Sequence, residues 1–116
     1  MPDRVKEEAL QLLSGRCLEL FLGGYQSEMT VLGVFVVATD NKTFSCEYAT
    51  SATEGRVGDT VYQGHRIEAI ALQRCEKSKQ KNGVDAPCRV FARRYEIVWR
   101  KTIERGLELN PFSVSN

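Results

Sequence analysis

Histidine and closely spaced cysteines are scarce in this chain, and their scarcity excludes several kinds of site. The 116 residues include one histidine, His65, and four cysteines, none of which belongs to a CxxC pair. Zinc centres and thiol redox motifs normally show such close pairs, so neither is expected. We therefore predict reduced, mostly buried thiols at Cys17, Cys46, Cys75 and Cys88, and no bound metal or other cofactor.

Catalytic and membrane signals are also missing. The chain has no GxSxG, HExxH or P-loop motif, and its carboxylates show no pairing pattern for acid–base work. No apolar run approaches the roughly 20 residues that cross a bilayer. The first ten residues, MPDRVKEEAL, are charged and do not resemble a signal peptide. These absences favour a non-enzymatic protein of the cytoplasm, or alternatively the nucleus, with neither a membrane nor a small-molecule substrate as partner.

Charge is nearly balanced overall but unevenly distributed. The net charge is +1, with −4 in residues 1–60 and +5 in residues 61–116. In the second half, basic residues alternate with Phe91, Tyr95 and Trp99; this basic patch comprises Arg89, Arg93, Arg94, Arg100, Lys101 and Arg105. Arginine interleaved with aromatics can bind RNA by charge and stacking. The alternative is that the aromatics dock on the core and leave the arginines in water.

The stretch 31–40, VLGVFVVATD, is the strongest candidate for the core. Its Val and Phe residues favour a strand, and the lack of strict alternation indicates that both faces are covered. Gly33 interrupts the run, and a glycine inside a strand often marks a bend or bulge. We therefore predict a long bent strand over residues 29–39 within a small, strongly curved β-barrel.

The remaining elements follow from periodicity and turn signals. Residues 3–14 carry an apolar helical stripe made of Val5, Ala9, Leu12 and Leu13. Further strands are expected at 16–22, 44–50, 60–62 and 66–74, with turns at 23–27, 40–42 and 63–65 and a loop at 51–59. The polar stretch 76–84 is predicted as a linker between a 1–75 domain and an 85–109 extension, with a loose tail at 110–116. For residues 88–105 we favour a helix, and a strand is the alternative.

This order of elements resembles the Sm/LSm family. The passages LQLLSGRCLELFL, GVFVVATD and YQGHRIEAIAL resemble that family's first helix and strand, second strand and last two strands. Within the family, the chain is most similar to the Sm-like auxiliary subunits of NatC N-terminal acetyltransferases. The matching residues, spread over 3–75, are Gly33, Phe35, Thr39, Asp40, Gly64, His65, Ile67, Ile70, Gln73 and Arg74. The resemblance implies a mainly β fold, a five-stranded bent barrel with an N-terminal helix, here followed by a C-terminal helix.

The chain departs from RNA-binding Sm proteins at two turns. Phe44 stands where they carry an Asn after the Asp turn, and Gln63-Gly64 replaces their Arg-Gly. Those lost side chains would hold a base, so their absence weakens sequence-specific single-strand binding. Pairing between barrels needs only backbone groups and shape, so it remains available.

We therefore predict a non-catalytic subunit that assembles with protein partners in a hetero-complex, as an acetyltransferase auxiliary subunit would. The alternative is an LSm ring subunit that binds single-stranded RNA, and a weaker one is a periplasmic secretion-type β-domain, suggested by VGDTVYQGHRIEAI. The contact residues expected in either leading case are Asp40, Asn41, Lys42, Gln63, Gly64, His65 and Arg66, with the basic patch beside them.

Overall fold

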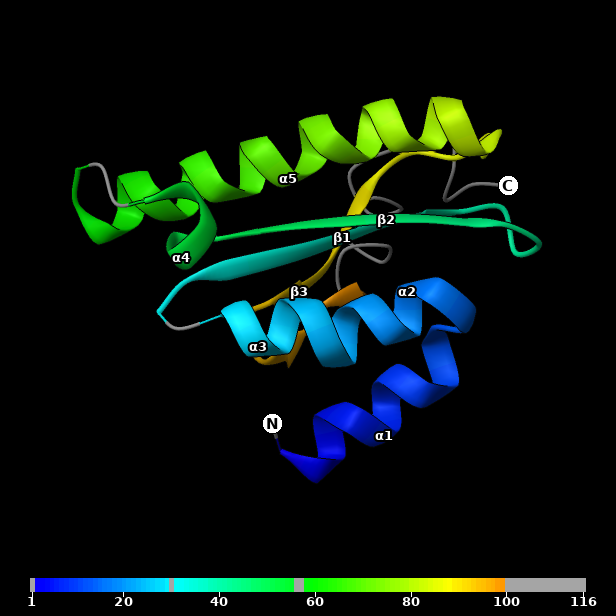
Figure 1. The fold of residues 1–116 in the computed structure, drawn as a ribbon, viewed down its shortest axis with the longest axis horizontal. Coiled ribbons are helices and arrows are strands. Elements are labelled where there is room, and N and C mark those ends of the chain that lie inside the picture. Colours follow the sequence, from blue (N-terminus) through cyan, green and yellow to red (C-terminus); the bar gives the residue numbers. More distant parts are fainter. Residues whose placement is uncertain (1, 30, 56–57, 100–116) are drawn as a thin grey trace, which may run out of the picture.

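An open, four-stranded antiparallel sheet forms the middle layer of the protein in this computed structural model (Figure 1). The structure describes residues 2–29, 31–55 and 58–99. The strands lie in the order β2-β1-β3-β4, with bounds β1 Gly33–Thr39, β2 Phe44–Thr50, β3 Arg89–Arg93 and β4 Glu96–Ile97. Two helical segments cover one face of the sheet. The first is α1 (Asp3–Leu12), and the second is made of α2 (Gly15–Glu19), η1 (Leu20–Tyr25) and α3 (Gln26–Glu28). After β2 the chain forms the short helix α4 (Ser51–Glu54) and the long helix α5 (Thr60–Asn82). Helix α5 covers the other face.

The predicted mainly β, five-stranded Sm-like barrel is wrong. About 54% of the described residues are helical and 22% are in strands, and the sheet is open. The expectation that β1 is buried on both faces is confirmed, since Val34–Ala38 are all buried. Helices, rather than the far wall of a barrel, cover those two faces.

Strand β1 divides its side chains between two separate cores. Phe35 and Val37 point into the core beneath α1–α3, whereas Val34, Val36 and Ala38 point into the core beneath α5. The strand predicted over residues 29–39 is shorter, because Met29 follows the end of α3 and Gly33 is the first residue of β1 rather than a break within it. A Cβ there would lie 2.6 Å from the Met29 side chain and 2.9 Å from the Tyr25 ring, so this position requires glycine because the first core packs against its backbone.

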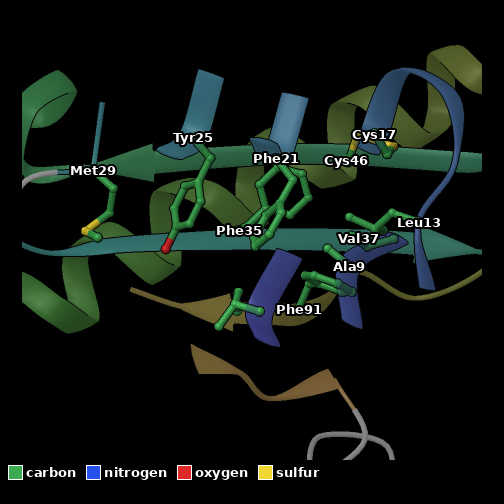
Figure 2. Packing of buried hydrophobic residues seen from close by; sticks show 12 residues of the cluster. Ala9, Leu13, Cys17, Phe21, Tyr25, Met29, Phe35, Val37, Cys46 and Phe91 are labelled. Atoms are coloured by element: carbon green, nitrogen blue, oxygen red, sulfur yellow. A yellow bond between two sulfur atoms is a disulfide. The ribbon is translucent and has the colours of Figure 1, made fainter. Parts of the chain in front are cut away.

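Segment 3–29 is helical almost throughout, so the strand predicted at 16–22 and the turn predicted at 23–27 are wrong. Every fourth residue from the first helix onward is buried in the first core: Val5, Ala9, Leu13, Cys17, Phe21, Tyr25 and Met29 (Figure 2). A stripe at this spacing drifts around an ordinary helix. The π-helical turns of η1, where the Gln26 amide reaches the Phe21 carbonyl, widen the helix and keep Phe21 and Tyr25 facing the sheet.

Helix α5 replaces the predicted strand 60–62, turn 63–65, strand 66–74 and most of the linker 76–84. It begins where the Asp59 carboxylate accepts a 2.9 Å hydrogen bond from the Tyr62 amide. It ends at Gly83, whose φ of 66° suits glycine. Its buried stripe again repeats every four residues, through Gln63, Ile67, Ala71 and Cys75, all fully buried. The β-branched and glycine residues that suggested strands lie within one long helix.

The hairpin between β1 and β2 matches the prediction. Strand β2 occupies the predicted 44–50, and the Asp40 carboxylate accepts hydrogen bonds from the Lys42 and Thr43 amides in the turn. These bonds lower the pKa of Asp40. Within the loop predicted at 51–59, residues Ser51–Glu54 form the short helix α4, capped by Thr50.

The segment after α5 forms strands rather than the favoured helix. Strand β3 pairs with β1 and then turns through Arg94, at φ 55°, into β4. The register slips by one residue between Phe35 and Val36, which leaves an extra residue on β3. The strand alternative for 88–105 is therefore correct as far as Ile97. Arg100, Lys101, Arg105 and the tail predicted at 110–116 lie outside the described residues.

All four cysteines form disulfides, so the prediction of reduced thiols is wrong. Cys17 of α2 is bonded to Cys46 of β2, and Cys75 of α5 is bonded to Cys88 just before β3. The bonded cysteines are 29 and 13 residues apart in sequence, so a search for CxxC pairs cannot detect these disulfides. Each disulfide fastens one helical layer to the chain of the sheet.

Replacing both members of one pair, Cys17 and Cys46, by alanine should lower the free energy of unfolding by about 3 kcal/mol, because a loop of this length is no longer closed in the unfolded chain. Urea unfolding without reductant measures the change. The matched Cys75→Ala/Cys88→Ala variant should lose a similar amount. Four reactive thiols in the denatured, unreduced protein would contradict both disulfides.

Candidate binding pocket beside α5

A hollow of about 460 Å³ lies between the first half of α5 and the ends of β1 and β3. We name it the α5 pocket; its lining residues are Leu32, Gly33, Val34, Val61, Gly64, His65, Ile67, Glu68, Arg93 and Arg94. The volume falls in the range of ordinary ligand pockets. Its floor is apolar, while its four titratable side chains are His65, Glu68 and the two arginines.

The α5 pocket is open on the helix side at Gly64. A Cβ at Gly64 would meet no atom within 4 Å, and Gly64 lines the hollow. Glycine inside a helix costs stability relative to alanine, and no close neighbour requires it here. Val61, which also lines the pocket, is 70% exposed. Both features leave apolar surface available to a ligand.

An ion pair closes one side of the pocket. Arg93 Nε lies 2.9 Å from Glu68 Oε1 and so joins β3 to α5. The pair is partly exposed, with half of the Arg93 side chain in solvent. Arg94 has no such partner among the described residues. The lining therefore carries two guanidinium groups against one carboxylate, which favours a negatively charged ligand group.

The backbone of Arg94 is held firmly although its side chain is exposed. Its amide donates to the Gly33 carbonyl at 2.9 Å, and its carbonyl accepts from the Tyr25 hydroxyl at 2.7 Å. Burial raises the pKa of Tyr25 far above its ordinary value, so the phenol stays protonated and continues to donate. The aromatic core thus fixes the turn that carries Arg93 and Arg94.

The structure brings together only some of the residues predicted as contacts. Gly64 and His65, both predicted, meet Arg93 and Arg94 of the basic patch at the α5 pocket. Asp40, Asn41 and Lys42 lie in the hairpin turn beyond Thr39, at the opposite end of β1 from the pocket. The two predicted turns therefore do not form one surface.

Gln63 and Arg66 have structural contacts instead. Gln63 is fully buried, and its side-chain amide donates to the Gly55 carbonyl. Arg66 donates to the Glu54 carbonyl at 3.1 Å. Burial alone would raise the pKa of Glu54, but hydrogen bonds from Arg74 and Thr53 outweigh it and lower that pKa. Both predicted residues thus fasten α5 to the end of α4.

The predicted basic patch is divided between two regions. Arg93 pairs with Glu68 of α5, whereas Arg89 lines a separate hollow with Leu12 of α1 and Trp99. The extra residue in β3 lies between the two arginines and changes the alternation of side chains along the strand. Within the predicted patch, Arg89 therefore lines a different hollow from Arg93 and Arg94.

Residues that sequence reasoning missed complete the pocket. Leu32, Val61, Ile67 and Glu68 line it, yet all four were placed in predicted strands. The spacing of Val61, Gly64 and Glu68 places them on one side of a helix, a signal that was visible only if 60–82 was predicted as helical.

Other kinds of site find no support in the described part of the chain. No group of three or more His, Cys, Asp or Glu side chains there could hold a metal ion. None of its helices is long and apolar enough to cross a bilayer. Comparison with known proteins identifies no matching sequence family, no related curated protein and no similar solved structure.

Gly64→Ala should raise the free energy of unfolding by about 1 kcal/mol, because alanine favours the helix and its methyl group meets no neighbour. Urea unfolding measures the change. As a control, Gly33→Ala should destabilise the protein, because its methyl group would collide with Met29 and Tyr25. A loss of stability in Gly64→Ala would show that the position is closed.

Proposed function

We propose that this protein is a non-catalytic binding domain whose α5 pocket receives an apolar side chain and an adjacent carboxylate of a protein partner. The proposal rests on one observation: the same open hollow has an apolar floor and is lined by Arg93 and Arg94. Pockets with an apolar lining and a few charged groups are the usual form of a specific binding site.

The proposal retains the assembly role predicted from the sequence, and drops both its specific version and the RNA-binding alternative. An acetyltransferase auxiliary subunit and an RNA-binding ring subunit were both implied by a small Sm-like barrel. The open sheet between helical layers removes that premise. What supports a protein partner is the chemistry of the α5 pocket together with the exposed Val61.

The proposed cellular compartment of the protein is inferred from its disulfide-bonded cysteines. Two disulfides persist where the surroundings are oxidising and are rare where glutathione keeps thiols reduced. The expectation of a cytoplasmic or nuclear protein rested on the charged first residues and the lack of a long apolar run, and it did not consider disulfides. We therefore propose that the protein works in an oxidising compartment, where its partner also resides.

A phage-displayed random peptide library, panned on the oxidised protein, tests the pocket. Selected peptides should carry an aromatic or branched apolar residue beside Asp or Glu. Gly64→Phe should abolish their binding, because the ring would occupy the open space at position 64. Arg94→Glu should weaken binding about tenfold or more, because it places like charges together.

Two matched variants control this experiment. Gly64→Ala keeps the pocket open and should bind as the original protein does. Lys77→Glu changes an exposed charge on α5 outside the pocket and should have little effect. Peptides that bind Gly64→Phe as well as the original protein, or a selection without acidic residues, would refute the proposed function.

A further inference from the structure

Strand β2 is an edge strand whose outward backbone groups can be assigned from the hydrogen-bond pattern. The Ser51 amide donates to the Leu32 carbonyl, and the Arg94 amide donates to the Gly33 carbonyl. Even-numbered residues of β1 therefore bond to β2, and odd-numbered ones face β3. From the register of Phe35 with Tyr48 and Val37 with Cys46, the backbone groups of Phe44, Cys46, Tyr48 and Thr50 point away from the sheet.

Part of this edge is already occupied by the protein itself. Arg74 Nη1 donates to the Tyr48 carbonyl at 3.2 Å, and the Thr50 amide donates to the Thr53 hydroxyl at 3.1 Å. Arg74 is held in place by Glu54, at 2.9 Å. The outward amide and carbonyl of Cys46 and the amide of Tyr48 have no such partner among the described residues. The available section is therefore Phe44–Tyr48.

The available section lies between the two helical layers. A hollow of about 300 Å³ is lined by Arg16 and Cys17 of α2, by Ser78 and Lys81 of α5, and by residues 44–47 of β2. A second hollow, of about 400 Å³, continues past Tyr48 between Leu20 and Arg74. We name the two together the β2 groove. Strand β2 forms its floor.

The recess decides what kind of occupant fits. Paired strands lie about 4.8 Å apart. A second copy of this chain would have to bring the α2 and α5 helices that line its own groove against those of the first copy before its β2 could pair. A single extended peptide is narrow enough to enter and to pair with the floor.

Charge indicates the chemistry of that peptide. Arg16 and Lys81 both line the hollow at the Phe44–Cys46 end, and neither forms an ion pair with another described residue. Glu47, the one carboxylate in this hollow, accepts a hydrogen bond from the Ser78 hydroxyl at 2.9 Å. This first hollow therefore holds two cations against one anion. The second hollow is lined by Glu28, Glu47 and Glu54 with Arg16 and Arg74, so an acidic side chain is favoured only at the Phe44–Cys46 end of the groove.

We propose that the β2 groove binds an extended peptide, which adds a fifth strand beside Phe44–Tyr48 and places an acidic side chain between Arg16 and Lys81. This surface is separate from the α5 pocket, so it stands or falls independently of the proposed function. Main-chain hydrogen bonds would supply most of the affinity, and the two cations would select the sequence.

Titration of the oxidised, ¹⁵N-labelled protein with acetyl-Thr-Val-Asp-Val-Thr-amide at millimolar concentration tests the proposal. The Cys46 and Tyr48 amides should shift and exchange more slowly with deuterium. At low salt, the matched peptide with Lys in place of Asp should bind about threefold more weakly, as expected for exposed ion pairs. The same peptide with N-methylated valines should not bind.

Lys81→Glu should remove the preference for Asp over Lys, whereas Lys77→Glu, on the same helix outside the groove, should leave it unchanged. Equal binding of the N-methylated peptide, or no change at Cys46 and Tyr48, would overturn the proposal. So would protection of those two amides in a dimer formed without peptide, because a second copy would then occupy the edge. Changes confined to residues around Gly64 would support the α5 pocket alone and refute the groove.

Discussion

The burial of β1 on both faces is the constraint on which the rest of the structure depends. Phe35 and Val37 are buried on one face of β1, and Val34 and Val36 are buried on the other. A single layer of helices could therefore not bury both faces of the strand. The helices α1–α3 and the helix α5 supply the two covers (Figure 1). The aromatic rings of Phe21, Tyr25 and Phe91 surround Phe35 at centroid distances of 5.1–6.0 Å, which makes the first core the more specific of the two.

The central hairpin and the first helix could be predicted from the sequence because each carries a short, unambiguous signal. Valine-rich β1 and the Asp40 turn are local features, and α1 has an ordinary apolar stripe. The predictions for residues 16–22 and 60–74 were wrong for a physical reason, because alternating leucines or isoleucines satisfy a strand pattern as well as a helical one. The deciding contacts, such as Phe21 on Phe35, are distant in sequence. The signals that could have corrected the prediction were Asp59 and Gly83, which bound α5 as caps, and the four-residue repeat from Val5 to Met29.

The candidate site was predicted only in pieces. Gly64, His65, Arg93 and Arg94 were named as contact residues, but nothing local shows that β3 returns beside α5. That juxtaposition depends on the antiparallel pairing of β1 with β3 and on the Cys75–Cys88 disulfide, which fastens the end of α5 to the start of β3. Four cysteines allow three pairings, so the sequence could not choose among them. The disulfides join α2 to β2 and α5 to the chain before β3, which are elements that line the β2 groove and the α5 pocket.

Native-state hydrogen exchange followed by NMR tests most directly whether the two-sided burial of β1 holds the protein together. The account predicts that the amides of Phe35, Val36 and Val37 exchange only through global unfolding, with a protection free energy equal to the free energy of unfolding measured in urea. The ends of α1 and α5 should exchange through smaller openings. If the β1 amides exchanged at a clearly lower free energy than those in the middle of α5, the central claim would be contradicted.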